Sequence, residues 1–362
     1  MIETAAGRTP ADDDPDRTLA RGYRRFVRRR VLVLLALGGL LVLSALVNIA
    51  LGPAELPLWR VVEGFVYPGL LSPAEHLILF DIRLPYAVLA LLVGACLGLA
   101  GAEMQTVLNN PLASPSTLGV MHAATLGASL SILFDWLSPA GLPVLLAVPV
   151  CAFIGALSAI ALIVFLSRVY GAAVETVVLF GIALVFALEA MIALVQFVAD
   201  SDSLQQIVFW TMGSLARASW DKIAVLAVVL ALCLPFSIRH VWKLTALRGG
   251  ESHARSFGIA VERLRLTVLI RAGLLTAVAV AFTGVIGFVG LVGPHIARLA
   301  LGEDHRFFLP GSVLAGGLIL SGASIASKTL LPGVLIPDGI VTALVGIPLL
   351  LSLLLSQQRR SL

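Results

Sequence analysis

The stretch KLTALRGGESHARSFGIAVERLR, residues 243–265, is the longest charged segment inside an otherwise apolar chain. We expect Gly249 and Gly250 to break any helix that arrives from the preceding apolar run. Glu251 then stands near a new helix start, where a negative charge suits the helix dipole, and Gly258 is expected to end that helix. The residues alone leave two interpretations open, which are a docking surface for a cytoplasmic partner and a solvated connecting loop.

An apolar stripe runs through the same segment. Ala254, Phe257 and Val261 follow one another at three- and four-residue steps, which places them on one face of a helix. The docking interpretation therefore predicts that these three side chains face a groove of the partner. A membrane protein that only passed solute would have little use for such a segment.

The composition indicates a membrane protein. Hydrophobic residues make up 59% of the 362 residues and charged residues only 13%, whereas a soluble domain has about 25% charged residues. The net charge of +4 does not indicate nucleic-acid binding, because the basic residues cluster beside apolar runs. Cys96, Cys151 and Cys233 lie inside apolar runs, so neither a disulfide framework nor metal-type cysteine spacing is expected.

Ten apolar runs predict an all-α polytopic membrane protein with about ten transmembrane helices. They lie at about residues 31–51, 84–107, 117–134, 142–166, 174–198, 223–238, 266–286, 287–301, 309–330 and 339–355. The domain organisation that follows is a disordered cytoplasmic tail over 1–30, a transmembrane domain over 31–356 and a cytoplasmic tail over 357–362. We expect the external segment 52–83 to hold a short amphipathic stretch and 200–219 to form an external surface helix.

The distribution of arginine and lysine predicts the orientation of the chain. With ten spans both termini lie on the same side, together with the basic residues of 21–30, Arg168 and the cluster 239–265. The segments assigned to the other side carry few basic residues. This positive-inside bias predicts that both termini lie on the cytoplasmic side of the membrane.

An internal repeat indicates two halves. The segment from Gly101 to Pro111 recurs as Gly284 to Pro294, at an offset of 183 positions. Each half would contain five spans, and because five is odd the second half would be inverted relative to the first. Inverted repeats are a recurrent transporter architecture, so they would also suit a secondary transporter driven by an ion gradient.

Motifs of catalysis are missing from the sequence. It contains no G-x-x-x-x-G-K-[ST] phosphate loop, no H-E-x-x-H, no C-x-x-C and no G-x-S-x-G. We therefore expect a chain that is not itself an enzyme, requires no cofactor and holds no metal.

Several long motifs resemble one family, the FecCD and BtuC-like permeases of ABC importers, which take up iron siderophores, haem and vitamin B12. The motifs are GACLGLAGAEMQTVLNNPLASPSTLGV (94–120), ALRGGESHARSFGI (246–259), GVIGFVGLVGPHIARLALGEDHR (284–306) and IPDGIVTALVGIPLLLSLLL (336–355). The resemblance implies a type II ABC importer permease with two inverted five-helix repeats. It also implies two cytoplasmic ATPase subunits, a second permease subunit, identical or not, and an extracytoplasmic binding protein.

The resemblance assigns the 243–265 segment to ATPase docking. The residues that carry the coupling contact would be Gly250, Glu251, Ala254, Arg255 and Gly258.

Further residues are assigned to docking and to the pathway by the same resemblance. Arg83 and Lys328 would dock the binding protein, although interface snorkelling would also explain them. The cytoplasmic gate would lie at Ala173 and Val174, where the family usually has small polar residues. Glu189 would line the pathway, with a protonated, hydrogen-bonded glutamic acid as the alternative.

Two further polar residues lie inside predicted spans, where ionisable groups are functional candidates. We interpret Glu103 as a polar contact between helices. Met121 and His122 could each ligate haem iron, but adjacent residues point about 100° apart on a helix, so they would not share a ligand.

The expected function is the permease of an ABC importer, with a ferric siderophore as cargo. Cobalamin and haem remain alternatives within the family, and an ion-driven transporter or a membrane scaffold remain alternatives outside it. The 243–265 segment separates the first of these classes from the others, because only an ABC importer needs it to couple transport to an ATPase.

Overall fold

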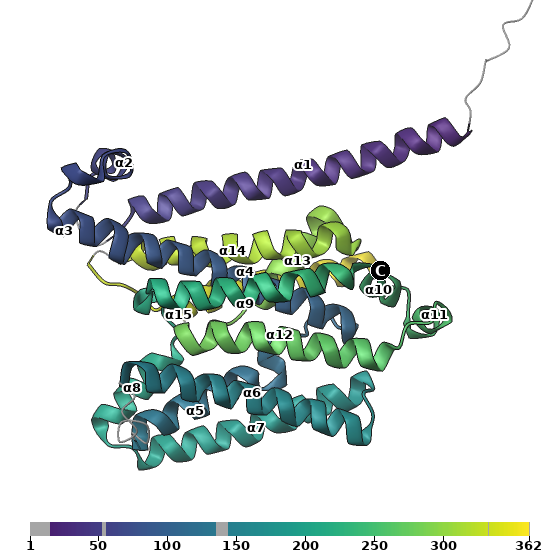
Figure 1. Ribbon diagram of the computed structural model, residues 1–362. Helices are drawn as coiled ribbons and strands as arrows, with labels where there is room; N and C mark the ends of the chain where they lie inside the picture. Colours follow the sequence, from purple (N-terminus) through teal and green to yellow (C-terminus); the bar gives the residue numbers. More distant parts are fainter. Residues whose placement is uncertain (1–14, 53–55, 135–143, 332, 362) are drawn as a thin grey trace, which may run out of the picture.

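The computed structural model describes residues 15–52, 56–134, 144–331 and 333–361, and every regular element within these ranges is helical (Figure 1). The longer helices are α1 (Pro15–Ala50), α4 (Leu84–Val107), α5 (Val120–Phe134), α6 (Val144–Tyr170), α7 (Val174–Val198), α9 (Trp220–Arg239), α12 (Val261–Thr283), α13 (Val289–Leu301), α14 (His305–Thr329) and α15 (Asp338–Ser361). The shorter ones are α2 (Leu58–Val66), α3 (Pro73–His76), α8 (Ser201–Thr211), α10 (Val241–Arg248) and α11 (Glu251–Ser256).

The ten predicted spans correspond to ten helices. Within the described ranges, seven helical segments are long and apolar enough to cross a bilayer, and three shorter apolar helices, α5, α13 and α15, complete the set. The expected surface helix within 200–219 is α8, and the expected amphipathic stretch within 52–83 is α2. The prediction of an all-α polytopic membrane protein is confirmed.

Helix α1 begins earlier than the sequence suggested. It starts at Pro15, so the expectation of disorder is wrong for residues 15–30, while residues 1–14 lie outside the described ranges. Its polar end is held by the start of α14, because Arg306 donates to the Tyr23 hydroxyl over 3.0 Å and Arg30 lies 3.7 Å from Asp304. The Arg30 guanidinium also stacks 3.6 Å from the Phe26 ring centroid. These contacts give the basic segment an ordered partner.

At the other end of the chain, helix α15 extends to Ser361 and so includes the predicted tail residues 357–361. Residue 362 lies outside the described ranges.

Helix α4 is the centre of the bundle and packs against α12, α13 and α14. Glycines allow this close packing, since a Cβ added to Gly101 would lie 1.7 Å from the Gly290 carbonyl oxygen, and one added to Gly94 would lie 2.4 Å from that of Gly316. Small residues let helix backbones approach in a membrane, where lipid provides no hydrophobic driving force between helices. The Gly-rich motif of α4 therefore fixes which helices surround it.

Helices α5, α6 and α7 form a second group, which joins the first through contacts of α6 with α12 (Figure 1). Here Gly127 of α5 faces the Cys151 carbonyl of α6 and Gly155 of α6 faces that of Ala123. Much of α7 is left uncovered, and the Phe197 side chain is 86% exposed.

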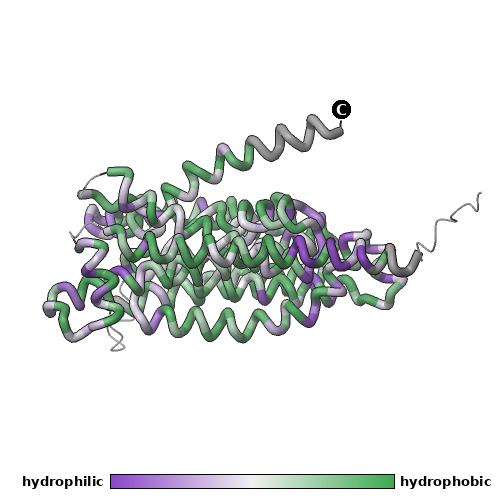
Figure 2. Tube along the Cα trace, turned by 90° about the horizontal axis from the view of Figure 1, so that it is seen from above, coloured by the Kyte–Doolittle hydropathy of each residue, from purple (hydrophilic) through white to green (hydrophobic). Residues whose placement is uncertain are grey.

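The bundle has two polar ends and an apolar middle (Figure 2). One end, here called the α11 end, holds α10, α11, the start of α1 and the ends of α4 and α15; the opposite α2 end holds α2, α3 and α8 (Figure 1). The basic residues that the sequence assigned to the inside lie towards the α11 end, which agrees with the predicted charge bias.

The two halves run in opposite directions where they meet. The end of α4 contacts the beginning of α12, since Arg265 donates to the Val107 carbonyl, so these helices are antiparallel, as inverted repeats require. The 183-residue offset does not align equivalent structure, because Gly101 lies inside α4 whereas Gly284 caps the end of α12 with φ 75°. The two glycines at this offset therefore have different roles, close helix packing at Gly101 and a helix cap at Gly284.

Candidate functional site

The 243–265 segment folds as two short helices followed by the start of a long one. Helix α10 ends at Arg248 and α11 begins at Glu251, which confirms the predicted break at Gly249 and Gly250. Gly250 has φ 107°, a backbone conformation that side-chain-bearing residues rarely adopt. The segment therefore turns sharply away from the bundle at this glycine.

A Schellman motif closes α11. Gly258 has φ 76°, its N–H donates to Arg255, and the Ile259 N–H donates to the Ala254 carbonyl over 3.2 Å. Only four residues, 257–260, then separate the end of α11 from α12, which begins at Val261. The short helix is thus held at both ends by glycines in left-handed or extended positive-φ conformations.

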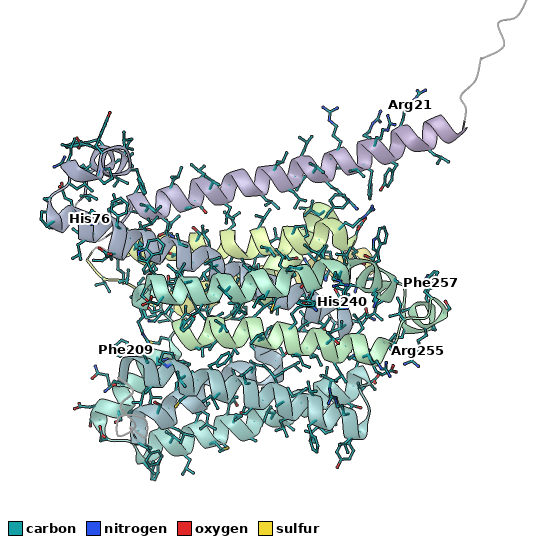
Figure 3. All side chains as sticks on the ribbon, in the orientation of Figure 1. Arg21, His76, Phe209, His240, Arg255 and Phe257 are labelled. Atoms are coloured by element: carbon teal, nitrogen blue, oxygen red, sulfur yellow. The ribbon has the colours of Figure 1, made fainter. Side chains whose placement is uncertain are left out.

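The predicted apolar stripe is divided between the interior and the surface. Ala254 and Val261 are fully buried against the chain's own core, whereas Phe257 is 65% exposed. The expectation that Ala254 touches a partner is therefore wrong, because its methyl group packs α11 against α10 and α12. Phe257 and Arg255 are instead the side chains that point outwards from α11 (Figure 3).

The exposed face of α11 is polar. Arg255 donates to Glu251 over 3.3 Å and to Glu262 over 2.7 Å, so its guanidinium bridges the start of α11 and the start of α12. Beside it, a groove of about 730 Å³ lies between α10 and the first turns of α12, with Trp242 and Lys243 among its lining residues. This face offers charged groups, an aromatic ring and a hollow to a protein at the α11 end.

A buried arginine connects α11 to the rest of the bundle. Arg265, 1% exposed, donates from Nε to the Val107 carbonyl over 2.9 Å, from Nη1 to the Ala172 carbonyl and from Nη2 to Glu251. In the sequence Arg265 is the last residue of the charged segment, and no local pattern there predicts a role for it. The missed signal was the helix start at Val261, which turns Arg265 inwards between the apolar neighbours Leu264 and Leu266.

The predicted gate residues lie next to this arginine. Ala173 is the N-cap of α7 and is exposed, and Val174 is half-buried at the first helical position. Both follow Ala172, whose carbonyl accepts from Arg265. The structure thus brings the predicted gate and the predicted coupling residue Glu251 to two sides of one guanidinium.

A second buried ion pair crosses the bundle. Glu103 of α4 is fully buried and accepts from Arg271 of α12, which donates from Nε to Oε2 over 2.9 Å and from Nη2 to Oε1. Arg271 also lies 3.4 Å from His240 Nδ1. The interpretation of Glu103 as a contact between helices agrees with this geometry, and the partner that the sequence analysis missed is Arg271.

The pathway candidate Glu189 has a partner as well. His122 Nε2 of α5 lies 3.5 Å from Glu189 Oε1 of α7. Next to them a cavity of about 350 Å³ opens between the start of α5 and the turn before α13. Its lining combines hydroxyl groups with apolar surface and includes Ser114, Ser116, Thr117, His122, Thr125 and Phe288.

Arg83 and Lys328 turn inwards at the α2 end. Arg83 donates to the carbonyls of Ile49 and Ala50, and Lys328 donates to the backbone carbonyl and the side chain of Asn48. Both cations therefore bind the last carbonyls of α1, where positive charge is favourable. Their assignment to binding-protein docking stays a prediction.

Charged residues also fix the turn between α13 and α14 at the α11 end. Arg248 donates to Glu303 over 3.0 Å and to Asn109 over 3.2 Å, which joins α10 to this turn and to the end of α4. The hydrogen bond from Arg306 lowers the pKa of the Asp304 carboxyl from its ordinary value. The α11 end thus carries several groups of paired charges.

In the part of the chain that the structure describes, no group of three or more His, Cys, Asp or Glu residues could hold a metal ion.

Comparisons with known proteins give a consistent result. A family model described as the FecCD transport family matches residues 40–356. The chain is 36% identical over 335 residues to the hemin transport system permease protein HmuU of Yersinia pestis, covering 91% of this chain and 98% of that protein. It is 34% identical over 333 residues to the vitamin B12 import system permease protein BtuC of Vibrio vulnificus, covering 91% and 95%. Among solved structures, an inward-facing ABC transporter assigned to the metal-chelate type has a TM-score of 0.78 and 30% identity, covering 90% of this chain and 99% of that one.

Proposed function

Because this chain belongs to the FecCD transport family and is the permease of an ABC importer, we propose that it carries a ferric siderophore inwards across a bacterial cytoplasmic membrane. The permease itself is not catalytic, and the ATP hydrolysis that drives it belongs to a partner subunit. The observation that carries the proposal is the α11 module, an exposed helix whose first residue, Glu251, is joined through Arg265 to the predicted gate turn.

The partners follow from the family and from the uncovered surfaces. Two ATPase subunits dock at the α11 end, with Gly250, Glu251, Arg255 and Gly258 forming or shaping the contact. A second permease subunit, identical or related, covers the exposed face of α7, where an 86% exposed Phe197 would otherwise face lipid alone.

The orientation follows the charges. The α11 end, with its arginines, faces the cytoplasm, which places both termini inside. The α2 end faces outwards and receives the binding protein. Arg83 and Lys328 support that surface by closing the end of α1.

The mechanism is a two-state change. Closure of the ATPase dimer displaces α11, and the displacement reaches Ala173 and Val174 at the cytoplasmic end of the pathway. The buried Ala254 packs the short helix α11 against α10 and α12, which fixes how these three helices lie against one another. Glu189 lines the pathway opposite His122.

The cavity beside α5 supports an oxygen-rich cargo. Its hydroxyl groups can donate to the oxygens of a chelate, and Phe288 adds an apolar wall. Haem is the weaker candidate, because His122 Nε2 already lies beside Glu189 and Met121 is buried in the core. Cobalamin remains the alternative within the family.

Transport across the membrane of reconstituted vesicles tests the proposal. The permease is reconstituted with its ATPase and a binding protein that is loaded with a ferric hydroxamate, cobalamin or haem, and uptake is measured with and without ATP. ATP-dependent uptake of the ferric chelate is expected, and deletion of residues 250–258 should abolish both uptake and ATPase co-purification. Uptake that persists in ATP-depleted vesicles under an ion gradient would indicate a secondary transporter. Uptake of cobalamin or haem, without uptake of the ferric chelate, would contradict the proposal that the cargo is a ferric siderophore.

A further inference from the structure

Three segments that lie far apart in the sequence converge on the side chain of Arg265. They are the end of α4 through the Val107 carbonyl, the α6–α7 turn through the Ala172 carbonyl and the start of α11 through Glu251. The guanidinium uses a different nitrogen for each partner. Among the fully buried side chains of the described residues, Arg265 is the largest.

Arginine is chemically suited to this position. Its guanidinium is planar, keeps its charge and presents five N–H donors in a fixed fork, whereas lysine offers one flexible ammonium group. A buried charge requires compensation, and Glu251 supplies the carboxylate. The Glu251 side chain is 41% exposed, so this connection begins at the protein surface and ends in the interior.

The surface end of the connection lies where a partner would act. Glu251 is the first residue of α11, directly after Gly250, and its other oxygen accepts from the exposed Arg255. The inner end is one residue before Ala173. A displacement of Glu251 therefore acts on a group that also holds the α6–α7 turn.

We propose that Arg265 is the positioning residue that makes the α6–α7 turn move with α11, so that the gate at Ala173 follows the ATPase. The inference rests on the proposed function and adds a specific path to it. When α11 shifts, the Glu251 carboxylate pulls on the guanidinium, and the guanidinium pulls on the Ala172 carbonyl. The hydrogen bond to the Val107 carbonyl anchors the guanidinium to the end of α4, which does not move.

The alternative is that Arg265 only stabilises the fold. A stabilising role predicts that substitution lowers the amount of folded complex while each remaining complex stays coupled. A positioning role predicts that assembled complexes hydrolyse ATP without moving the gate. The two roles therefore differ in a readout other than protein yield.

The test uses the complete complex of permease, ATPase and loaded binding protein in proteoliposomes. The three native cysteines are replaced and Ala173→Cys supplies a reporter, whose labelling by a maleimide is measured without nucleotide and with ATP and vanadate. The variants are Arg265→Gln, Arg265→Lys and Glu251→Gln. Arg168→Gln, a change of an exposed arginine at the same end of the bundle, is the matched control.

In the unsubstituted complex, labelling at position 173 should differ between the two conditions. In Arg265→Gln this difference should disappear, ATP hydrolysis should continue, and cargo moved per ATP should fall by about tenfold or more, as expected when hydrogen bonds to a charged group are lost. Cargo moved per ATP in Arg265→Lys should lie between the values for the unsubstituted complex and for Arg265→Gln. Arg168→Gln should match the unsubstituted complex.

The outcomes distinguish a failure of this inference from a failure of the proposed function. ATP-dependent labelling and unchanged cargo per ATP in Arg265→Gln would overturn the inference and leave the proposed function standing. If Arg265→Gln fails to assemble, Glu251→Gln decides, because it removes the carboxylate from the partly exposed end of the connection and leaves the arginine in place. Normal coupling in the assembled Glu251→Gln complex would overturn the inference. An unsubstituted complex that shows no ATP-driven uptake would overturn both.

Discussion

The buried pair between Glu103 and Arg271 should be the most sensitive polar contact of the bundle. Both side chains are almost completely buried, and two hydrogen bonds join them, one of 2.9 Å. At that separation the attraction between unit charges is about 6 kcal/mol for an effective permittivity of about 20. The desolvation of both groups offsets much of it, so the pair adds little net stability over two apolar residues.

Removal of one partner is a different perturbation. Glu103→Met leaves the Arg271 guanidinium buried beside His240 without its carboxylate, and Arg271→Met leaves a buried carboxylate alone. Each single substitution should lower the free energy of unfolding by about 3–5 kcal/mol, and the double substitution should recover most of this loss. The expected coupling energy, the sum of the single effects minus the effect of the double substitution, is therefore about 4 kcal/mol or more.

Unfolding in mixed micelles with a rising fraction of denaturing detergent measures these differences, followed by fluorescence of the five tryptophans. The four proteins of the cycle are compared under one condition, and reversibility is checked by dilution back into mild detergent. Single effects that simply add in the double variant would refute the reasoning, because they would show that the two side chains do not stabilise the bundle as a pair.

Three further predictions concern packing, backbone and charge. Gly101→Ala should prevent correct assembly of the helices, because the new methyl group would lie 1.7 Å from the Gly290 carbonyl oxygen, and size-exclusion chromatography of the detergent-extracted protein measures the loss. Gly250→Ala should leave the transmembrane bundle folded but weaken ATPase binding, since φ 107° strains any other residue by about 1–3 kcal/mol; a pull-down titration measures it. Asp304→Asn should lower stability at neutral pH and make it less dependent on pH. The pKa of Asp304 is lowered in the folded chain, so its contribution to stability is present above the unfolded pKa and is lost as the pH falls through the lower folded pKa. Unfolding measured from pH 7 down to about pH 2, well below the ordinary aspartate pKa of about 4, tests this.

The two glycine predictions each have a control in the chain. Gly38→Ala adds a methyl group that meets nothing within 4 Å and should assemble normally. Gly249→Ala changes the neighbouring glycine, which has φ −75°. Its methyl group would lie 3.0 Å from the His253 ring, a side chain that can shift, so this variant should keep its affinity for the ATPase. Normal assembly of Gly101→Ala, equal ATPase affinity of the two glycine variants, or an unchanged pH profile of Asp304→Asn would each contradict its prediction.

The sequence alone determined the class of protein and the positions of its helices. A membrane span must satisfy its backbone within one apolar segment of sufficient length, so hydropathy and local charge locate it without knowledge of its neighbours. The break before α11 was also readable, because glycine at 249 and 250 acts on its own backbone. The main local error was the start of α1, where contacts with Tyr23 and Arg30 continue the helix into a segment that composition alone marked as a tail.

The roles of the charged side chains were decided only by the tertiary structure. Arg265 reaches Val107 across 158 positions and Arg271 reaches Glu103 across 168, distances at which no local pattern specifies a partner. The same packing buries Ala254, which spacing alone had placed on a docking stripe. A buried charge is stable only where the folded chain brings a complementary group to it, and that meeting depends on how antiparallel helices from the two halves are packed.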